Sequence, residues 1–180
     1  MLLQQYKIVF GGTMGAGKTA AIKALSDISV VSTEARNTDV KSHNKQLTTI
    51  GIDYGEINLE DGTKIGLYGT PGQDRFDFMW PIVCRGALGI VVLIDHSSND
   101  RLQNLEFYLN AFKEYGNNIV IGITHLDKQD DQVLKIYRDW MALYNCQCPL
   151  FGIDARKKDD VLLMIETLIA SLEVQSNLTV

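Results

Sequence analysis

Cysteine and proline are scarce in this chain of 180 residues, with three of each. So few cysteines, in an odd number, argue against a disulfide framework and indicate a reducing, cytoplasmic environment. Cys146 and Cys148 form a C-x-C pair, but no second pair and no nearby histidine completes a set of four ligands, so we do not expect a zinc site. The formal net charge of −5 argues against a nucleic-acid partner bound through broad phosphate contacts.

Long apolar runs are missing as well. The longest, residues 87–94, is too short to cross a bilayer. The first residues do not show the basic and apolar regions of a signal peptide, and the last four, Asn177-Leu178-Thr179-Val180, contain no cysteine that could carry a lipid. We therefore expect no direct membrane anchor. Apolar residues still make up 46% of the chain, which is enough for one domain spanning residues 1–180.

Strand-like and helix-like segments alternate along the chain. Short runs rich in Val and Ile predict buried parallel strands at residues 6–10, 87–95, 118–124 and 149–154. Two more strand-like runs, residues 50–59 and 64–68, flank an Asp-Gly turn and predict a hairpin. The predicted fold class is α/β, with a six-stranded, mostly parallel sheet, one antiparallel strand and helices on both faces.

Three apolar stripes with helical spacing predict helices that pack on this sheet. The stripes are Leu102, Leu105, Leu109 and Phe112; Val133, Ile136, Trp140 and Tyr144; and Val161, Ile165, Leu168 and Leu172. By contrast, residues 26–49 are polar and fit no regular element. A loop of that length in a compact domain is usually functional, so we expect this segment to take part in the activity.

One motif indicates what the chain binds. Residues 12–19 read G-T-M-G-A-G-K-T, the phosphate-binding pattern G-x-x-x-x-G-K-[ST], and they follow a predicted strand. Its glycines free the backbone to aim successive N–H groups at phosphate oxygens, and the helix that follows adds its positive end. We expect Lys18 to reach the β- and γ-phosphates and the Thr19 hydroxyl to ligate Mg²⁺. The residues expected around the phosphates are Gly12, Thr13, Met14, Gly15, Ala16, Gly17, Lys18, Thr19 and Ala20.

Two later motifs accompany the phosphate loop. Residues 48–54 read T-T-I-G-I-D-Y, and residues 68–76 read Y-G-T-P-G-Q-D-R-F. Together the three motifs resemble those of the Ras-like small GTPases, and the resemblance runs from about Tyr6 to Leu172. Residues 48–54 are similar to the end of switch I in the Rab-like branch, and residues 68–76 are similar to the start of switch II. Details such as Pro71-Gly72-Gln73 most resemble bacterial members, which often work with small roadblock-fold regulators.

The resemblance implies a role for each switch. Thr49 would bind Mg²⁺ and the γ-phosphate, with Thr48 as the competing candidate, and the Gly72 N–H would reach the same phosphate. Losing that phosphate would release both loops. Gln73 matches the position that orients the attacking water, and Lys18 would assist catalysis through its charge. The alternative for Gln73 is an ordinary exposed loop residue.

This chain also departs from the family pattern. The family usually has an aspartate at the first position of D-x-x-G, which steadies the Mg²⁺ shell, but that position is Gly69 here. Asp53 and Asp74 are nearby carboxylates in the sequence, and neither is in the matching position. Met14 stands where glycine is common and would crowd the γ-phosphate. Gly69 implies weaker Mg²⁺ binding, and Met14 implies slow intrinsic hydrolysis.

Base recognition is the weakest match. Where the family has N-K-x-D, this chain reads Thr124-His125-Leu126-Asp127. Asp127 would accept hydrogen bonds from guanine, and His125 would stack on the base. Thr124 would take over part of the bracing role of the asparagine in N-K-x-D. Asp154 and Ala155 align with the family's S-A-K, whose backbone N–H contacts the guanine oxygen. The alternatives are a surface histidine for His125 and a loop or capping carboxylate for Asp127.

The leading functional prediction is a cytoplasmic, GTP-binding signalling switch that binds GTP and GDP with Mg²⁺ and hydrolyses GTP slowly. A regulatory partner, for example one with a roadblock fold, would stimulate it through residues 32–49 and 69–80. Phe76, Phe78 and Trp80 would anchor that partner if they face outward, and the alternative is that they pack under the switch helix. The sequence does not decide which of Arg36, Arg75 and Arg85, if any, is an arginine finger. The alternatives are a nucleotide-binding scaffold with negligible turnover, suggested by Gly69, and an ATP-dependent kinase, which the absence of an arginine-rich lid disfavours.

Overall fold

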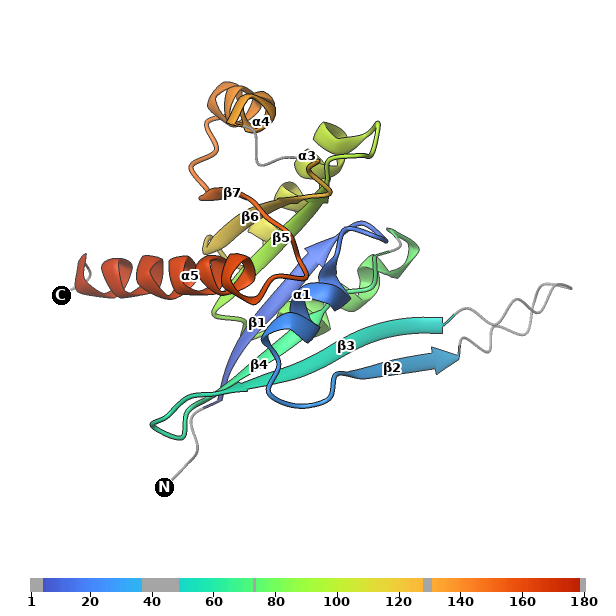
Figure 1. Cartoon of the computed structure of the whole chain (residues 1–180), viewed down its shortest axis with the longest axis vertical. Helices are drawn as coiled ribbons and strands as arrows, with labels where there is room; N and C mark the ends of the chain where they lie inside the picture. Colours follow the sequence, from blue (N-terminus) through green and yellow to red (C-terminus); the bar gives the residue numbers. More distant parts are fainter. Residues whose placement is uncertain (1–4, 37–48, 73, 128–130, 179–180) are drawn as a thin grey trace, which may run out of the picture.

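The computed structural model describes residues 5–36, 49–72, 74–127 and 131–178, and in them strands and helices alternate (Figure 1). The strands are β1 (Gln5–Gly12), β2 (Val31–Arg36), β3 (Thr49–Asn58), β4 (Lys64–Gly69), β5 (Gly89–Asp95), β6 (Ile119–Thr124) and β7 (Leu150–Gly152). The helices are α1 (Lys18–Leu25), the 3-10 segment η1 (Asp74–Met79), α2 (Trp80–Cys84), α3 (Arg101–Lys113), α4 (Asp131–Leu143) and α5 (Lys158–Leu178).

The strands form one sheet in the order β2-β3-β4-β1-β5-β6-β7. β1 pairs in parallel with β4 and β5, and β5, β6 and β7 continue the parallel part. β3 is antiparallel to both of its neighbours, so among these strands it alone runs against the rest. The prediction of a mostly parallel sheet with one reversed strand is confirmed, but the predicted number of six strands was wrong, because the sheet has seven.

The additional strand is β2, which lies inside the segment predicted to be an irregular loop. Its sequence, V-S-T-E-A-R, lacks the alternation of apolar residues that marks a half-buried strand. Among the described strands, β2 pairs only with β3, at the edge of the sheet (Figure 1). The backbone hydrogen bonds of an antiparallel ladder hold an edge strand without requiring apolar side chains. A polar edge strand of this kind therefore leaves little signal in the sequence.

The hairpin between β3 and β4 was predicted correctly. Gly62 has a φ of 83°, a left-handed conformation that favours glycine, and the Leu59 N–H donates to the Thr63 carbonyl at 2.9 Å. This turn pairs Asn58 with Lys64, and the register continues along the two strands to Asp53 opposite Gly69. The turn thus decides which side chains of β3 lie beside the end of β4.

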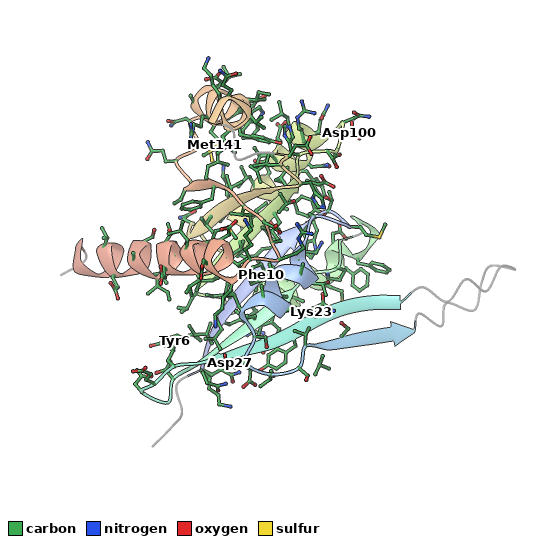
Figure 2. The ribbon with its side chains drawn as sticks, in the orientation of Figure 1. Tyr6, Phe10, Lys23, Asp27, Asp100 and Met141 are labelled. Atoms are coloured by element: carbon green, nitrogen blue, oxygen red, sulfur yellow. The ribbon has the colours of Figure 1, made fainter. Side chains whose placement is uncertain are left out.

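Helices cover both faces of the sheet, as the continuous apolar strands predict. Ile8 and Phe10 of β1 pack in one core with α1 and α5, whereas Val9 packs in a second core with α2, α3 and α4. Phe10, labelled in Figure 2, lies near the middle of the fold and is fully buried. Because successive side chains of a strand point to opposite faces, β1 is enclosed on both sides and its end is held firmly.

The three predicted apolar stripes differ in how well they match the buried faces of the helices. In α3 and α5 most of the predicted residues are buried, and only Leu102 and Leu172 are partly exposed. In α4 the predicted stripe was wrong, because Leu134, Tyr137 and Met141 are buried while Ile136 and Tyr144 are exposed. The two stripes differ by a shift of one residue. Both are apolar, so spacing alone could not distinguish them.

Candidate nucleotide-binding site

The predicted phosphate loop leaves the carboxyl end of β1 and enters α1. In open α/β sheets a binding crevice forms where neighbouring strands connect in opposite directions, and β1, between β4 and β5, is such a strand. Gly12, Gly15 and Gly17 have φ values of 135°, 84° and 99°, as expected for a loop that requires glycine. A Cβ on Gly12 would lie 2.1 Å from the Leu93 carbonyl oxygen, so no side chain fits there.

A pocket of about 450 Å³ opens beside this loop. Its walls come from the phosphate loop and α1, from β2 and β3, and from the segment after β4. The residues are Met14, Gly15, Gly17, Lys18, Thr19, Ala20, Ser32, Gly51, Asp53, Thr70 and Gly72. Seven of these belong to the predicted site, and the pocket therefore brings the phosphate-loop residues together with Gly72.

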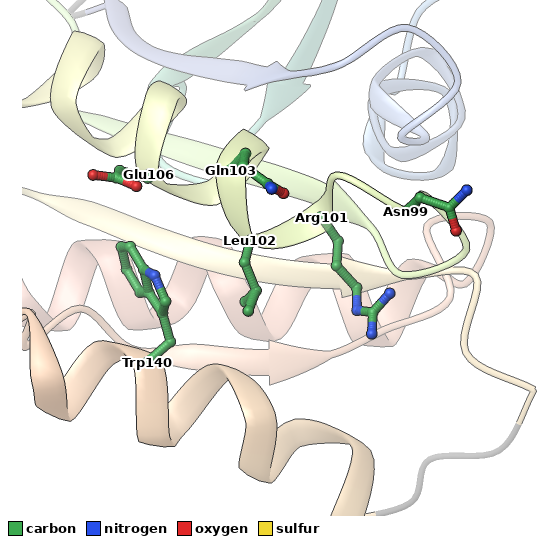
Figure 3. Close-up of a pocket in the computed structure, with 6 residues that line it drawn as sticks. All are labelled: Asn99, Arg101, Leu102, Gln103, Glu106 and Trp140. Atoms are coloured by element: carbon green, nitrogen blue, oxygen red, sulfur yellow. The ribbon is translucent and has the colours of Figure 1, made fainter.

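A second pocket, of about 350 Å³, lies between α3 and α4 (Figure 3). Arg101, Gln103 and Glu106 on one side and Trp140 on the other contribute to its lining. None of its residues belongs to the predicted site. The chemistry of the motifs is confined to the first pocket and the loops next to it.

Lys18 is held by the loop from which it extends. Its Nζ donates to the carbonyl oxygens of Gly12 and Thr13, each at 2.7 Å, and only 8% of the residue is exposed. Burial lowers the pKa of Lys18 to about 8, and the negative charge of Asp53 opposes that shift. A cation held so close to the loop is available to bound phosphates.

Next to Lys18, three side chains meet at the pocket wall. The Thr19 hydroxyl donates to Oδ2 of Asp53, and the Ser32 hydroxyl donates to Oδ1 of the same carboxylate at 2.5 Å. Thr19 was predicted from the sequence, whereas Asp53 and Ser32 had no predicted role in the site. A signal for Asp53 was present, because counting back from the hairpin turn places it opposite Gly69.

The chemistry of this group fits Mg²⁺, which prefers oxygen ligands and keeps several waters. Within the described part of the chain, no group of three or more His, Cys, Asp or Glu side chains could hold a metal ion. Bound Mg²⁺ would therefore rely on hydroxyls, a single carboxylate and phosphate oxygens. Thr49, the other predicted ligand, is the first residue of β3, but its side chain lies outside the described part.

The segment after β4 closes onto the phosphate loop. The Met14 N–H donates to the Gly72 carbonyl at 3.0 Å, and a Cβ on Gly72 would lie 2.7 Å from Nζ of Lys18. Gly72 thus lies so close to the phosphate loop that a residue with a side chain would not fit at this position. The Met14 side chain is 72% exposed and extends toward solvent. Gln73, the predicted catalytic residue, lies outside the described residues.

The loop after β6 contacts the phosphate loop from the other side. The buried Thr124 hydroxyl lies 3.0 Å from the Ala16 carbonyl oxygen and 3.3 Å from that of Ile94, and it also contacts Nδ1 of His125 at 3.0 Å. Thr124 thus ties the end of β6 to the phosphate loop. His125 has a φ of 57°, an uncommon conformation for a residue other than glycine, and its side chain extends to the surface near Asp95.

The loop after β7 completes this side of the site. A Cβ on Gly17 would lie 2.8 Å from Cβ of Ala155, so Ala155 packs directly on the phosphate loop. Asp154 accepts two hydrogen bonds from the Arg156 guanidinium, which hold its pKa well below the usual range, and its N–H donates to Asp160 at 2.8 Å. Asp154 is therefore engaged within its own loop, and Ala155 is the residue that reaches the site.

Asp127 is exposed just beyond β6. Its negative charge acts on His96, which follows β5; burial lowers the pKa of His96, and Asp127 opposes this shift. The Nδ1 atom of His96 lies 2.8 Å from the Tyr137 hydroxyl. Asp127 therefore lies at the surface, three residues beyond Thr124 at the end of β6.

The three aromatic residues after β4 do not form the expected outward-facing group. Phe76 and Trp80 are each only 3% exposed, and Trp80 packs against the rings of Tyr108 and Phe112. Only Phe78 of the three faces solvent, with 58% of its surface exposed. An anchoring role is wrong for Phe76 and Trp80, because both are buried and Trp80 is part of the core that α2 and α3 share.

A family model described as "conserved hypothetical ATP binding protein" matches residues 10–175. The chain belongs to this family. The match includes the phosphate loop, the three loops that contact it and the whole sheet except the start of β1. In the described residues, no helix is long and apolar enough to cross a membrane.

Relatives of this chain include Rab proteins. The chain is 25% identical to Ras-related protein Rab-18 of Lymnaea stagnalis over 142 residues, which cover 74% of this chain and 64% of that one. It is 29% identical to Ras-related protein Rab-13 of Canis lupus familiaris over 124 residues, covering 67% of this chain and 54% of the relative. The chain thus matches between about half and two-thirds of the length of these proteins.

Two solved structures show the same fold. One is a bacterial selenocysteine-specific elongation factor, EF-Sec, with a TM-score of 0.66, 21% identity, and coverage of 93% of this chain and 29% of that one. The other is the G domain of the T. maritima FeoB iron transporter, with a TM-score of 0.61, 16% identity, and coverage of 93% and 98%. The predicted Ras-like, P-loop architecture is confirmed at the level of the fold.

Proposed function

We propose that this chain is a single-domain, GTP-binding switch that binds GTP and GDP with Mg²⁺ and hydrolyses GTP slowly. The observation that carries the proposal is the pocket beside the phosphate loop, which Lys18, Thr19 and Gly72 line together. The phosphate loop is contacted by Gly72 from one side and by Thr124 and Ala155 from the other. A nucleotide bound there has its phosphates on the loop and its base against the residues that follow β6 and β7.

The choice of guanine rests on Asp127. A carboxylate accepts hydrogen bonds from both N1–H and the exocyclic amine of guanine, and adenine offers no such pair of donors. The exposed Asp127 is on the side of the site where Thr124 and Ala155 touch the phosphate loop. The family description names ATP, whereas the Rab relatives favour a guanine nucleotide. The nucleotide is therefore the first point to test.

The roles that we propose for the residues rest on the resemblance to Ras-like GTPases, and those of Lys18, Thr19 and Gly72 also on their places in the pocket. Lys18 supplies positive charge to the phosphates, and the hydroxyls of Thr19 and Thr49 hold Mg²⁺, which neutralises phosphate charge when bound. The Gly72 N–H detects the γ-phosphate, and Gln73 orients the attacking water. A cytoplasmic regulatory protein, for example one with a roadblock fold, would stimulate turnover by acting on the segments around β2 and η1.

A second candidate is a nucleotide-binding scaffold with negligible turnover. Gly69 favours it, because the position that steadies the Mg²⁺ shell in related GTPases has no side chain here. The two functions share every binding contact and differ only in hydrolysis. Binding alone therefore cannot distinguish them.

Single-turnover assays with the purified protein test the proposal. The protein is mixed with GTP or ATP in excess Mg²⁺, and bound nucleotide and released phosphate are followed over time. We expect tight binding of GTP, slow release of phosphate and weak binding of ATP, with Lys18→Ala as the non-binding control. GTP binding without phosphate release would support the scaffold, and preferential binding of ATP would refute the guanine assignment.

A further inference from the structure

The space beside Gly69 is filled by a carboxylate from the neighbouring strand. Gly69 is the last residue of β4 and pairs with Asp53 of β3. A Cβ on Gly69 would lie 3.3 Å from Cβ of Asp53, 3.6 Å from its Oδ2 and 3.1 Å from Cδ1 of Ile22. The Asp53 side chain thus lies directly beside the space into which a side chain at residue 69 would extend.

The carboxylate of Asp53 is also held at the phosphate site. One of its oxygens accepts from the Thr19 hydroxyl and the other from the Ser32 hydroxyl. All three residues line the pocket beside the phosphate loop. These contacts come from α1, β2 and β3, so the orientation of the carboxylate is determined by three separate elements.

We propose that Asp53 provides the carboxylate of the Mg²⁺ site in this chain, from β3 instead of β4. The inference rests on the proposed function and specifies how its metal is held. The proposed direct ligand, the Thr19 hydroxyl, touches this carboxylate, so a cation bound by Thr19 is next to a fixed negative charge. Mg²⁺ favours such an arrangement, with few protein ligands, retained waters and a nearby carboxylate.

This exchange explains why position 69 is glycine. A side chain at residue 69 would compete with Asp53 for one space, and a second carboxylate there would add repulsion at close range. Gly69 and Asp53 therefore form a matched pair: Gly69 has no side chain, and Asp53 supplies the carboxylate. The alternative is that Asp53 only accepts hydrogen bonds from the Thr19 and Ser32 hydroxyls and balances the charge of Lys18.

The test measures Mg²⁺ dependence in four full-length proteins. These are the wild type, Asp53→Asn, Glu56→Gln and the exchange variant Asp53→Gly/Gly69→Asp. Asp53→Asn keeps the size of the side chain and removes its charge. Glu56→Gln is the matched control, because Glu56 is on the same strand but pairs with Tyr54 and Lys64. Thermal melting of each protein shows that it is folded.

The readout is the release rate of a fluorescent GDP analogue at increasing Mg²⁺, together with direct binding of Mn²⁺ by electron paramagnetic resonance. We expect Asp53→Asn to need about tenfold more Mg²⁺ for half-maximal retention, since lost partners of metal ligands cost 10–100-fold in affinity. Its GDP release in EDTA should match the wild type. Glu56→Gln should behave as the wild type throughout, and the exchange variant should recover most of the lost Mg²⁺ affinity.

Two results would overturn the inference. One is an unchanged Mg²⁺ midpoint in Asp53→Asn, and the other is a loss of GDP affinity that is equal with Mg²⁺ and with EDTA, which would assign Asp53 a structural role only. In both cases the wild type still binds nucleotide and the proposed function stands. Failure of the wild type to bind GDP would instead overturn the proposed function, and this inference with it.

Discussion

The Thr124 hydroxyl lies 3.0 Å from the carbonyl oxygen of Ala16 and ties the end of β6 to the phosphate loop. The bond joins residues that are 108 positions apart in the sequence. It fixes the spacing between the loop that would carry the phosphates and the loop that would carry the base. Preorganisation of this kind lowers the conformational cost of binding.

Thr124→Val tests this bond, because valine keeps the shape and removes the hydroxyl. The buried carbonyl of Ala16 then loses its donor, which typically costs about 1–3 kcal/mol. We expect a lower unfolding free energy by urea denaturation and a weaker nucleotide affinity by calorimetry. Thr167→Val is the matched control, since that hydroxyl bonds the carbonyl of Leu163 within α5. If Thr124→Val binds nucleotide as tightly as Thr167→Val, the bond does not organise the site.

The titration of Lys18 gives nucleotide binding a pH dependence. Burial lowers its pKa to about 8 in the free protein, and the negative charge of bound phosphates should raise it again. The complex then holds more protons than the free protein above pH 8. Binding therefore takes up protons, and affinity should fall as the pH rises through about 8. Calorimetry at pH 8.5 in buffers of different ionisation enthalpy measures this uptake, and a binding heat that does not depend on the buffer would contradict it.

The same shift affects the stability of the free protein. Because the pKa falls from 10.5 in the unfolded chain to about 8 in the fold, the unfolded chain binds more protons between these values. Stability from this group therefore rises with pH across that window, by up to about 3 kcal/mol at 1.36 kcal/mol per unit. Buried cysteine and tyrosine groups titrate at higher pH, so the difference between wild type and Lys18→Met isolates the effect. A pH-independent difference would contradict the assignment.

The sequence predicted the parts of the site that follow from backbone chemistry. A glycine-rich loop between a strand and a helix has few alternatives, and Gly12, Gly15 and Gly17 adopt the left-handed conformations that the motif requires. The motifs assigned no role to Asp53, whose place beside Gly69 depends on the register of two paired strands and not on a local pattern. Hydrophobic patterning also missed β2, which is polar, and chose the wrong face of α4, where two apolar stripes overlap.

Asp127→Ala tests the base assignment. Losing a hydrogen bond to a charged group costs about 1.5–3 kcal/mol, so GTP affinity should fall roughly tenfold or more while ATP affinity changes little. Asp154→Ala serves as a comparison, because that carboxylate pairs with Arg156 and should not contribute to base choice. Equal affinities of the wild-type protein for ATP and GTP, measured by calorimetry, would refute the assignment.

The final prediction concerns the switch itself. If the γ-phosphate orders the segments on either side of the pocket, residues 32–49 and 69–80 should exchange amide hydrogen more slowly with a non-hydrolysable GTP analogue than with GDP. The Met14 to Gly72 hydrogen bond is one contact through which the phosphate loop would transmit that difference. Peptides from β6 and α5, which belong to the core, should exchange equally in both states. Equal protection of the two segments with either nucleotide would show that this protein binds nucleotide without acting as a switch.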